Sequence, residues 1–192
     1  MSLFDVGAHF GIFSLVAAHF QGNALAVDPS PEALRMVNLQ ARLNNWSDRI
    51  RTIRAAASDS ADGIDMLAAG VLSDHYFVAA PGRDRNELTH LDTTTVDQLS
   101  RSFGPPTHLK IDVEGFEATV VRGARTTLKD SMPLVFLELH NEILLANGGD
   151  PNAALNELES VGYQIFGIDG EPTSREVIFR KAITRVVARV VH

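Results

Sequence analysis

Residues that could bind a nucleoside begin almost at the start of the chain. The stretch D-V-G-A-H-F-G (residues 5–11) follows a short apolar run, and the next apolar run ends on Asp28. Glycines between a strand and a helix let the backbone approach a ligand closely, and an acid at the end of the next strand accepts hydrogen bonds from ribose hydroxyls. The pattern therefore predicts a nucleoside-binding site built on these two turns.

The glycine turn lacks the motifs of two common classes of nucleotide-binding site. The chain has neither the G-x-x-x-x-G-K-[ST] of a phosphate loop nor the G-x-G-x-x-G of a dinucleotide site, because His9 stands where the close-approach glycine would be. A bulky side chain there disfavours a pyrophosphate and is compatible with a ligand that has no phosphate, such as S-adenosylmethionine. Asp59, after the third apolar run, is placed to meet the adenine amino group.

A second set of polar residues could take a proton from an acceptor. Asp112 and Glu114 follow Lys110 at the end of one apolar run, and Glu138 and His140 alternate onto one side at the end of the next. Histidine has the pKa best suited to a base near neutrality. The same donors could hold Mg²⁺, but spacing alone does not define a metal site, so no metal ligand is predicted.

Each candidate also has a structural alternative. Asp28 could be a turn residue before Pro29. Asp112 and Glu114 could cap the following helix or pair with Lys110. Glu117 is interpreted as a first-turn helix acid rather than a catalyst.

The elements that must position these residues alternate along the chain. Strands are predicted at 3–6, 24–27, 50–57, 108–113 and 134–139, and helices at 10–20, 31–44, 95–103, 116–128 and 151–161. Such alternation builds a mostly parallel sheet with helices on both faces, and ligands bind beyond the carboxyl ends of its strands. The polar residues at or just past those ends are Asp5, Asp28, Asp59, Asp112, Glu114, Glu138 and His140.

The remaining segments are less regular. Hairpin-like pieces are predicted at 64–67 and 75–79, and 163–168 is expected to pair with 177–180 as a closing antiparallel pair. Lys181, Arg185 and Arg189 recur every four residues, which is interpreted as a solvated helix face.

Composition narrows the function classes. The 192 residues are 45% hydrophobic, which suits one domain with a sizeable core. A net charge of −7 disfavours nucleic acid as a partner, and the absence of cysteine excludes disulfides, thiolate nucleophiles and cysteine zinc sites. Because the chain has no apolar run of membrane-spanning length and no signal-peptide pattern, we expect a cytoplasmic protein without a membrane partner.

Several motifs resemble the FkbM family of S-adenosylmethionine-dependent methyltransferases. The most specific is K-I-D-V-E-G-F-E (110–117), which lies within the matching stretch 108–124 and is followed by P-L-V-F-L-E-L-H (133–140). The stretches D-V-G-A-H-F-G-I-F-S-L (5–15), D-P-S-P-E-A-L (28–34) and T-T-T-V-D-Q-L (93–99) also match. The resemblance covers roughly residues 3–180.

The resemblance implies a class I methyltransferase (Rossmann-like) fold, with a mostly parallel seven-stranded sheet and a C-terminal antiparallel hairpin, forming a single domain over 1–192. It implies S-adenosylmethionine as cofactor and methylation of a hydroxyl on a small molecule or glycan. The chain departs from the family at His9, where Asn is usual, and in having no segment ahead of the first strand to help cover the cofactor.

Together, the residues and the resemblance yield two predicted sets. The predicted cofactor-binding residues are Asp5, Gly7, Ala8, His9, Gly11, Asp28, Pro29, Ser58, Asp59 and Asp112. The predicted catalytic residues are Lys110, Asp112, Glu114, Glu138 and His140. Two alternatives stay open: a non-catalytic cofactor-binding or interaction module of the same fold, and an NAD(P)-dependent reductase, which the missing G-x-G-x-x-G disfavours.

Overall fold

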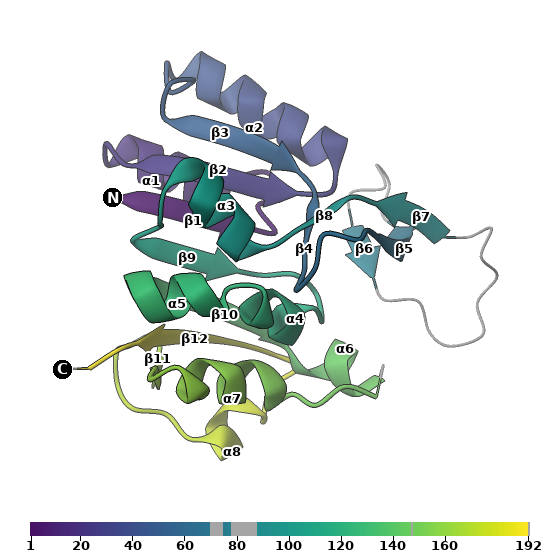
Figure 1. Cartoon of the computed structure of the whole chain (residues 1–192), viewed down its shortest axis with the longest axis vertical. Coiled ribbons are helices and arrows are strands. Elements are labelled where there is room, and N and C mark those ends of the chain that lie inside the picture. The colour runs from purple at the N-terminus through teal and green to yellow at the C-terminus, as the bar shows by residue number, and fades with distance from the viewer. Residues whose placement is uncertain (70–74, 78–87, 147, 192) are drawn as a thin grey trace.

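A seven-stranded sheet forms the centre of the computed structural model, which describes residues 1–69, 75–77, 88–146 and 148–191. The strand order is β11-β12-β10-β9-β1-β2-β3 (Figure 1). The strands are β1 (Ser2–Val6), β2 (Asn23–Asp28), β3 (Ile50–Arg54), β9 (His108–Ile111), β10 (Leu134–His140), β11 (Gln164–Gly167) and β12 (Ile183–Arg189). Six of them run in the same direction, and β12 runs antiparallel to both of its neighbours, β10 and β11. The predicted mostly parallel sheet with a C-terminal antiparallel pair is confirmed.

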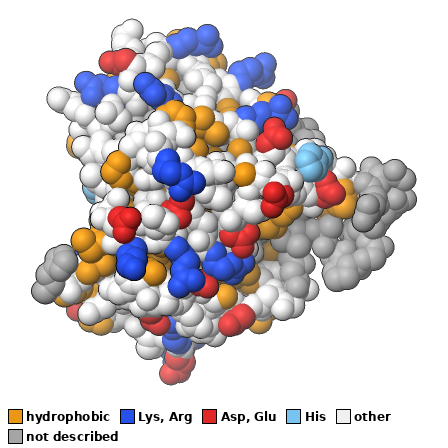
Figure 2. Space-filling view, viewed as in Figure 1, with side chains coloured by type: hydrophobic (Ala, Val, Ile, Leu, Met, Phe, Trp, Pro, Cys, Tyr) orange, Lys and Arg blue, Asp and Glu red, His pale blue; other side chains and the backbone are white. Residues whose placement is uncertain are grey.

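Helices cover both faces of this sheet. They are α1 (Ile12–His19), α2 (Pro31–Leu43), α3 (Val96–Phe103), α4 (Glu117–Arg122), α5 (Arg125–Ser131), α6 (Asn141–Ala146), α7 (Ala153–Ser160) and α8 (Arg175–Ile178). Alternate residues of a strand point to opposite faces, so Leu3 belongs to the core cluster that includes α1 and α2, whereas Phe4 belongs to the cluster that includes α3, α4, α5 and α7. Figure 2 shows basic and acidic side chains intermixed over the face that carries the second group of helices.

Two helix starts follow from the sequence as predicted. The Ser30 hydroxyl accepts a hydrogen bond from the Ala33 N–H at 3.2 Å, with Pro31 in the first helical position of α2. Thr95 and Gln98 form a reciprocal capping box at the start of α3. These caps fix where α2 and α3 begin.

A smaller β-layer lies beside the carboxyl ends of the central strands (Figure 1). It contains the parallel pair β4 (Ala56–Ala57) and β8 (Thr93–Thr94), and the three strands β5 (Ile64–Ala69), β6 (His75–Phe77) and β7 (Leu88–Leu91). The single strand predicted at 50–57 is therefore wrong, because Ala56 leaves the central sheet and pairs with Thr93 instead. The pieces predicted at 64–67 and 75–79 match β5 and β6, although residues 78–79 lie outside the described residues.

Three predictions for the second half of the chain need correction. The segment predicted as one helix at 116–128 forms two helices, α4 and α5, which are separated at Gly123. At that position an added Cβ would lie 2.0 Å from the Ser58 carbonyl oxygen. The predicted strand at 177–180 is instead the end of α8 and the turn after it, and β11 pairs with β12. The helix face predicted for the basic residues is also wrong, because Arg185 and Arg189 lie on the strand β12. Four-residue spacing places side chains on one face of a strand as well.

Among the described residues, no helix is long and apolar enough to cross a membrane.

Candidate active site

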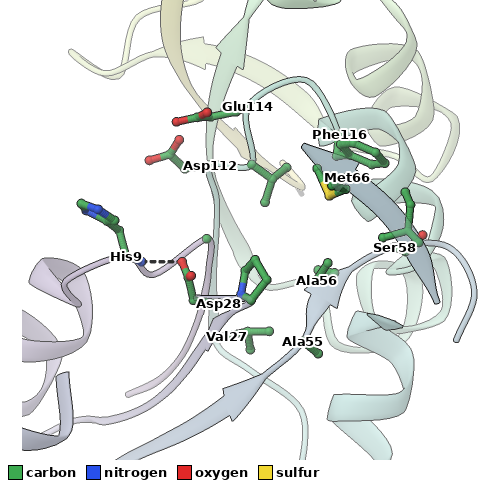
Figure 3. A pocket seen from close by; sticks show the side chains of 15 residues that line it. His9, Val27, Asp28, Ala55, Ala56, Ser58, Met66, Asp112, Glu114 and Phe116 are labelled. Atoms are coloured by element: carbon green, nitrogen blue, oxygen red, sulfur yellow. Dashed lines mark hydrogen bonds between the residues drawn. The ribbon is translucent and has the colours of Figure 1, made fainter. Parts of the chain in front are cut away.

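A cavity opens at the carboxyl ends of β1, β2 and β9, between the central sheet and the smaller β-layer (Figure 3). Its lining combines acids with apolar side chains: Gly7, His9, Val27, Asp28, Pro29, Ala55, Ala56, Ala57, Ser58, Ile64, Met66, Asp112, Val113, Glu114 and Phe116. Figure 3 shows the acids Asp28, Asp112 and Glu114 on one side, with Met66 and Phe116 on the other. The cavity thus has a negatively charged half and an apolar half.

The glycine turn lies where the sequence predicts it, but Gly7 is required for a different reason. Its φ is +70°, and an added Cβ would lie 1.7 Å from the Asp112 carbonyl oxygen. The neighbouring chain, rather than a ligand, therefore excludes a side chain at position 7. His9 also adopts a left-handed conformation (φ 47°), which His tolerates better than most residues, and its side chain reaches the cavity.

Asp28 connects this turn to the start of α2. Its side chain is buried, with Oδ2 accepting the His9 N–H at 2.8 Å and Oδ1 accepting the Ser30 N–H at 2.9 Å. Burial raises the pKa of Asp28 above the usual aspartate value, although the hydrogen bonds from Ser30 and His9 act in the opposite direction. A carboxylate has about four acceptor positions, so two backbone donors leave capacity for further donors from the cavity.

The apolar half of the cavity contains residues that the sequence did not single out. Ile64 and Met66 come from β5, and Phe116 comes from the turn before α4. β5 is recognisable as a lining strand only once its antiparallel pairing with β7 is known, and that pairing is non-local. Together with the alanines of 55–57, these side chains form a wall suited to a flat heteroaromatic ring.

Asp5 and Lys110 lie beneath the cavity rather than in its wall. Asp5 is fully buried, and its Oδ2 accepts hydrogen bonds from the Ser14 N–H at 3.0 Å and from the Ser14 hydroxyl at 2.7 Å. Lys110 Nζ donates to the Gly7 carbonyl at 2.6 Å and lies 3.5 Å from Asp5 and 3.3 Å from Asp112. Both residues therefore support the glycine turn, and their predicted contacts with cofactor and substrate stay predictions.

Some of the other predicted cofactor-binding residues line the cavity and some do not. Pro29 and Ser58 line the cavity, whereas Ala8 and Gly11 do not. Asp59 lies outside the lining, where its carboxylate pairs with Arg122 at 3.1 Å. Its predicted contact with an adenine amino group stays a prediction.

His140 lies next to the charged half of the cavity. Its Nδ1 is 2.8 Å from Glu117 Oε1, and its Nε2 is 3.7 Å from Asp112 Oδ1 and 3.9 Å from Glu138 Oε1. Burial alone would lower the pKa of His140, but the hydrogen bond and charge of Glu117 and the charges of Asp112 and Glu138 raise it above the usual value. The arrangement suits a base that takes up a proton at Nε2.

Glu117 is the residue at this centre that the sequence interpretation missed. It is in the first turn of α4, as expected, but it is fully buried instead of solvated. A signal was present, because Glu117 shares the helix face of the buried Val120 and Val121 at positions i+3 and i+4.

The donor atoms of Asp112, Glu138 and His140 lie within 4.8 Å of one another and could hold a metal ion. Both carboxylates already have basic partners. Asp112 lies 3.3 Å from Lys110, and Glu138 accepts two hydrogen bonds from Arg185 at 2.5 and 3.1 Å. Divalent cations would compete with these pairs, so a Mg²⁺ site stays an unfavoured prediction.

The strand order and the covering helices are those of the class I methyltransferase fold. The structure superimposes on methyltransferase FkbM from Methylobacillus flagellatus KT with a TM-score of 0.62 and 18% identity, covering 98% of this chain and 44% of that one. It also matches precorrin-6y C5,15-methyltransferase from Geobacter metallireducens GS-15 (TM-score 0.54, 11% identity, 100% of this chain and 80% of that one). A third match is ribosomal protein L11 methylase from Lactobacillus delbrueckii subsp. bulgaricus (TM-score 0.54, 15% identity, 100% and 70%).

The family is shown by the sequence itself. The methyltransferase FkbM domain matches residues 5–165, so the chain belongs to the FkbM methyltransferase family, as its motifs predicted. Family and fold together support S-adenosylmethionine as the cofactor. No curated protein matches the chain. The chain spans less than half the length of the Methylobacillus structure.

Proposed function

We propose that this chain transfers a methyl group from S-adenosylmethionine to a hydroxyl oxygen of a small molecule or glycan. One observation carries the proposal: Asp112 lines the cavity and also lies 3.7 Å from His140 Nε2. The predicted cofactor cavity and a proton-accepting group are therefore adjacent. We also propose that residues 1–192 act as one methyltransferase domain.

The donor set of the cavity fits this cofactor. Asp28 is a buried carboxylate with acceptor capacity left, which suits the two ribose hydroxyls. Met66 and Phe116 supply apolar surface for the adenine ring, and Ser58 lies on the same side. Asp112 and Glu114, at the other side, suit the positively charged methionine part.

The chemistry required of the protein is modest. When bound, S-adenosylmethionine supplies a methyl group that is already activated as a sulfonium, so the enzyme mainly aligns the acceptor. His140 takes the hydroxyl proton at Nε2, and the carboxylates of Asp112 and Glu138 stabilise the imidazolium that results. Lys110 holds Asp112 in place through its 3.3 Å ion pair.

A small-molecule or glycan acceptor is favoured over nucleic acid. The net charge is −7, and the face in Figure 2 shows basic and acidic side chains intermixed. Half of the predicted site residues line one cavity, which supports a small ligand rather than an extended surface: Gly7, His9, Asp28, Pro29, Ser58, Asp112 and Glu114.

The test is a methyl-transfer assay with labelled S-adenosylmethionine over a panel of alcohols, phenols and glycans, with mass spectrometry to locate the new methyl group on oxygen. Transfer to oxygen that is lost in His140→Gln supports the proposal. S-adenosylhomocysteine binding with no transfer across the panel would favour the non-catalytic module instead. Methylation found only on nitrogen or carbon would contradict O-methylation.

A further inference from the structure

The buried carboxylate of Glu117 has no role in the function proposed above. The side chain is fully buried at the start of α4. Its Oε1 accepts the Gly115 N–H at 3.0 Å and faces His140 Nδ1 at 2.8 Å. Its Oε2 is buried and has no hydrogen-bond partner among the described residues. A buried carboxylate is costly, so the contacts of Oε1 indicate what the residue is for.

The contact with His140 determines where the imidazole carries its proton. Oε1 already accepts the Gly115 N–H and therefore acts as an acceptor, so its 2.8 Å contact with the ring places a hydrogen on Nδ1. In the neutral ring, Nε2 then has a free lone pair. That atom lies 3.7 Å from Asp112 and 3.9 Å from Glu138, beyond hydrogen-bonding distance of either.

We propose that Glu117 is a positioning residue that holds His140 in the Nδ1-protonated form, with Nε2 directed at the charged half of the cavity as the proton acceptor. The proposal rests on the methyltransferase function proposed above. It adds a residue to that site and gives it a role that reaches the substrate only through His140.

Glu117 also connects the histidine to the turn that carries Asp112 and Glu114. The same Oε1 accepts the N–H of Gly115, which has a φ of +100°, and the preceding Glu114 has a φ of 49°. One oxygen therefore fixes both the left-handed turn after β9 and the ring at the end of β10. Positions held this way keep their geometry when an acceptor enters.

Three carboxylates surround His140, and two of them have cationic partners of their own. Asp112 pairs with Lys110 and Glu138 pairs with Arg185, so the negative charge of each is already partly neutralised. Within the described part of the chain, the ion-pair partner of Glu117 is His140 itself. Glu117 is therefore the acid whose charge acts most directly on the imidazolium formed by proton uptake.

The experiment is a nitrogen-detected NMR titration of the ¹⁵N-histidine-labelled full chain, which reports the tautomer and the pKa of each ring. The chain has seven histidines, and His140→Asn assigns the resonances of interest by their loss. We expect the neutral His140 ring to show a protonated Nδ1 and a bare Nε2.

Two variants separate orientation from charge. In Glu117→Gln, the amide oxygen can still accept the Nδ1–H, so the tautomer persists while the titration midpoint of His140 shifts downward. In Glu117→Ala, no acceptor is left and the Nδ1-protonated form is lost. Asp97→Asn is the matched control, because Asp97 accepts the N–H groups of Thr126 and Thr127 outside the cavity lining. It is expected to leave His140 unchanged.

A His140 ring that carries its proton on Nε2 in the wild-type chain would overturn the proposal, as would an unchanged tautomer in Glu117→Ala. If Glu117→Ala does not fold, the wild-type tautomer and the Glu117→Gln titration still decide. Neither readout involves cofactor or acceptor. Failure of the methyltransferase proposal would appear as an absence of methyl transfer while the tautomer stays as predicted, so the two failures are distinguishable.

Discussion

Replacing Asp28 with Asn removes the charge that we expect to hold the ribose. The carboxylate is buried and its two oxygens already accept the His9 and Ser30 N–H groups. Hydrogen bonds to a charged acceptor contribute about 1.5–3 kcal/mol each, against about 0.5–1.5 kcal/mol for neutral ones. With two ribose hydroxyls affected, the loss is about 2 kcal/mol or more, roughly a 30-fold rise in the Kd for S-adenosylhomocysteine.

The same change also affects folding, so the assay must separate the two effects. An amide oxygen replaces only one of the two acceptors, which leaves one backbone N–H short of a partner at a cost of about 1–3 kcal/mol. Isothermal titration calorimetry measures the Kd, and chemical denaturation measures the free energy of unfolding. Asp97→Asn is the control, because it weakens the bonds to Thr126 and Thr127 outside the cavity lining.

Both variants weaken hydrogen bonds to backbone N–H groups, so both should lower the free energy of unfolding, but only Asp28→Asn should also raise the Kd. A Kd within twofold of wild type in Asp28→Asn would remove Asp28 from the ribose site. An equal loss of binding in Asp97→Asn would show that stability, not recognition, caused the effect.

Four further predictions concern the same site. Gly7→Ala should lower the free energy of unfolding by about 2 kcal/mol or more, since its Cβ would lie 1.7 Å from a backbone oxygen; Gly162→Ala, with open space around it, should cost only about 1 kcal/mol in the same denaturation assay. Glu138→Gln should cut methyl transfer and leave S-adenosylhomocysteine affinity nearly intact, because Glu138 lies outside the cavity lining; a parallel loss of affinity would make it cofactor-binding or structural. The raised pKa of Asp28 means that folding favours the protonated carboxyl. The free energy of unfolding of the wild type relative to Asp28→Asn should therefore fall as pH rises from below 3.8 through the raised pKa. A relative free energy of unfolding that rises over this range would contradict the prediction. Chelation with EDTA should leave methyl transfer unchanged, because Lys110 and Arg185 already pair with the candidate ligands; loss of activity restored by Mg²⁺ would establish the metal site.

The parts of the fold that the sequence predicts are those set by local pattern. The turn from β1 into α1, the position of Asp28 and the caps at Ser30 and Thr95 each depend on a few neighbouring residues. The motif at 110–117 joins the end of β9 to the start of α4 within eight residues, so its place in the fold is also set locally.

The parts that the sequence does not predict depend on partners far along the chain. The spacing of Arg185 and Arg189 fits a helix and a strand equally well, and only pairing with β10 and β11 decides for the strand. Ala56 leaves the central sheet because Thr93 offers it a partner.

The same limit applies to the site. Only some of the acids at the strand ends line the cavity, because others bind side chains outside it. Asp5 accepts a hydrogen bond from Ser14, Asp59 pairs with Arg122, and Glu138 pairs with Arg185. The importance of Glu117 likewise depends on His140, which lies on a different element.

The central claim is that this cavity binds S-adenosylmethionine, and calorimetric titration of the purified chain with S-adenosylhomocysteine tests it most directly, with NADH as the control ligand. We expect one site with a Kd on the order of micromolar for S-adenosylhomocysteine and no heat of binding for NADH. Binding of NADH, or of neither ligand, would contradict an S-adenosylmethionine site in this cavity.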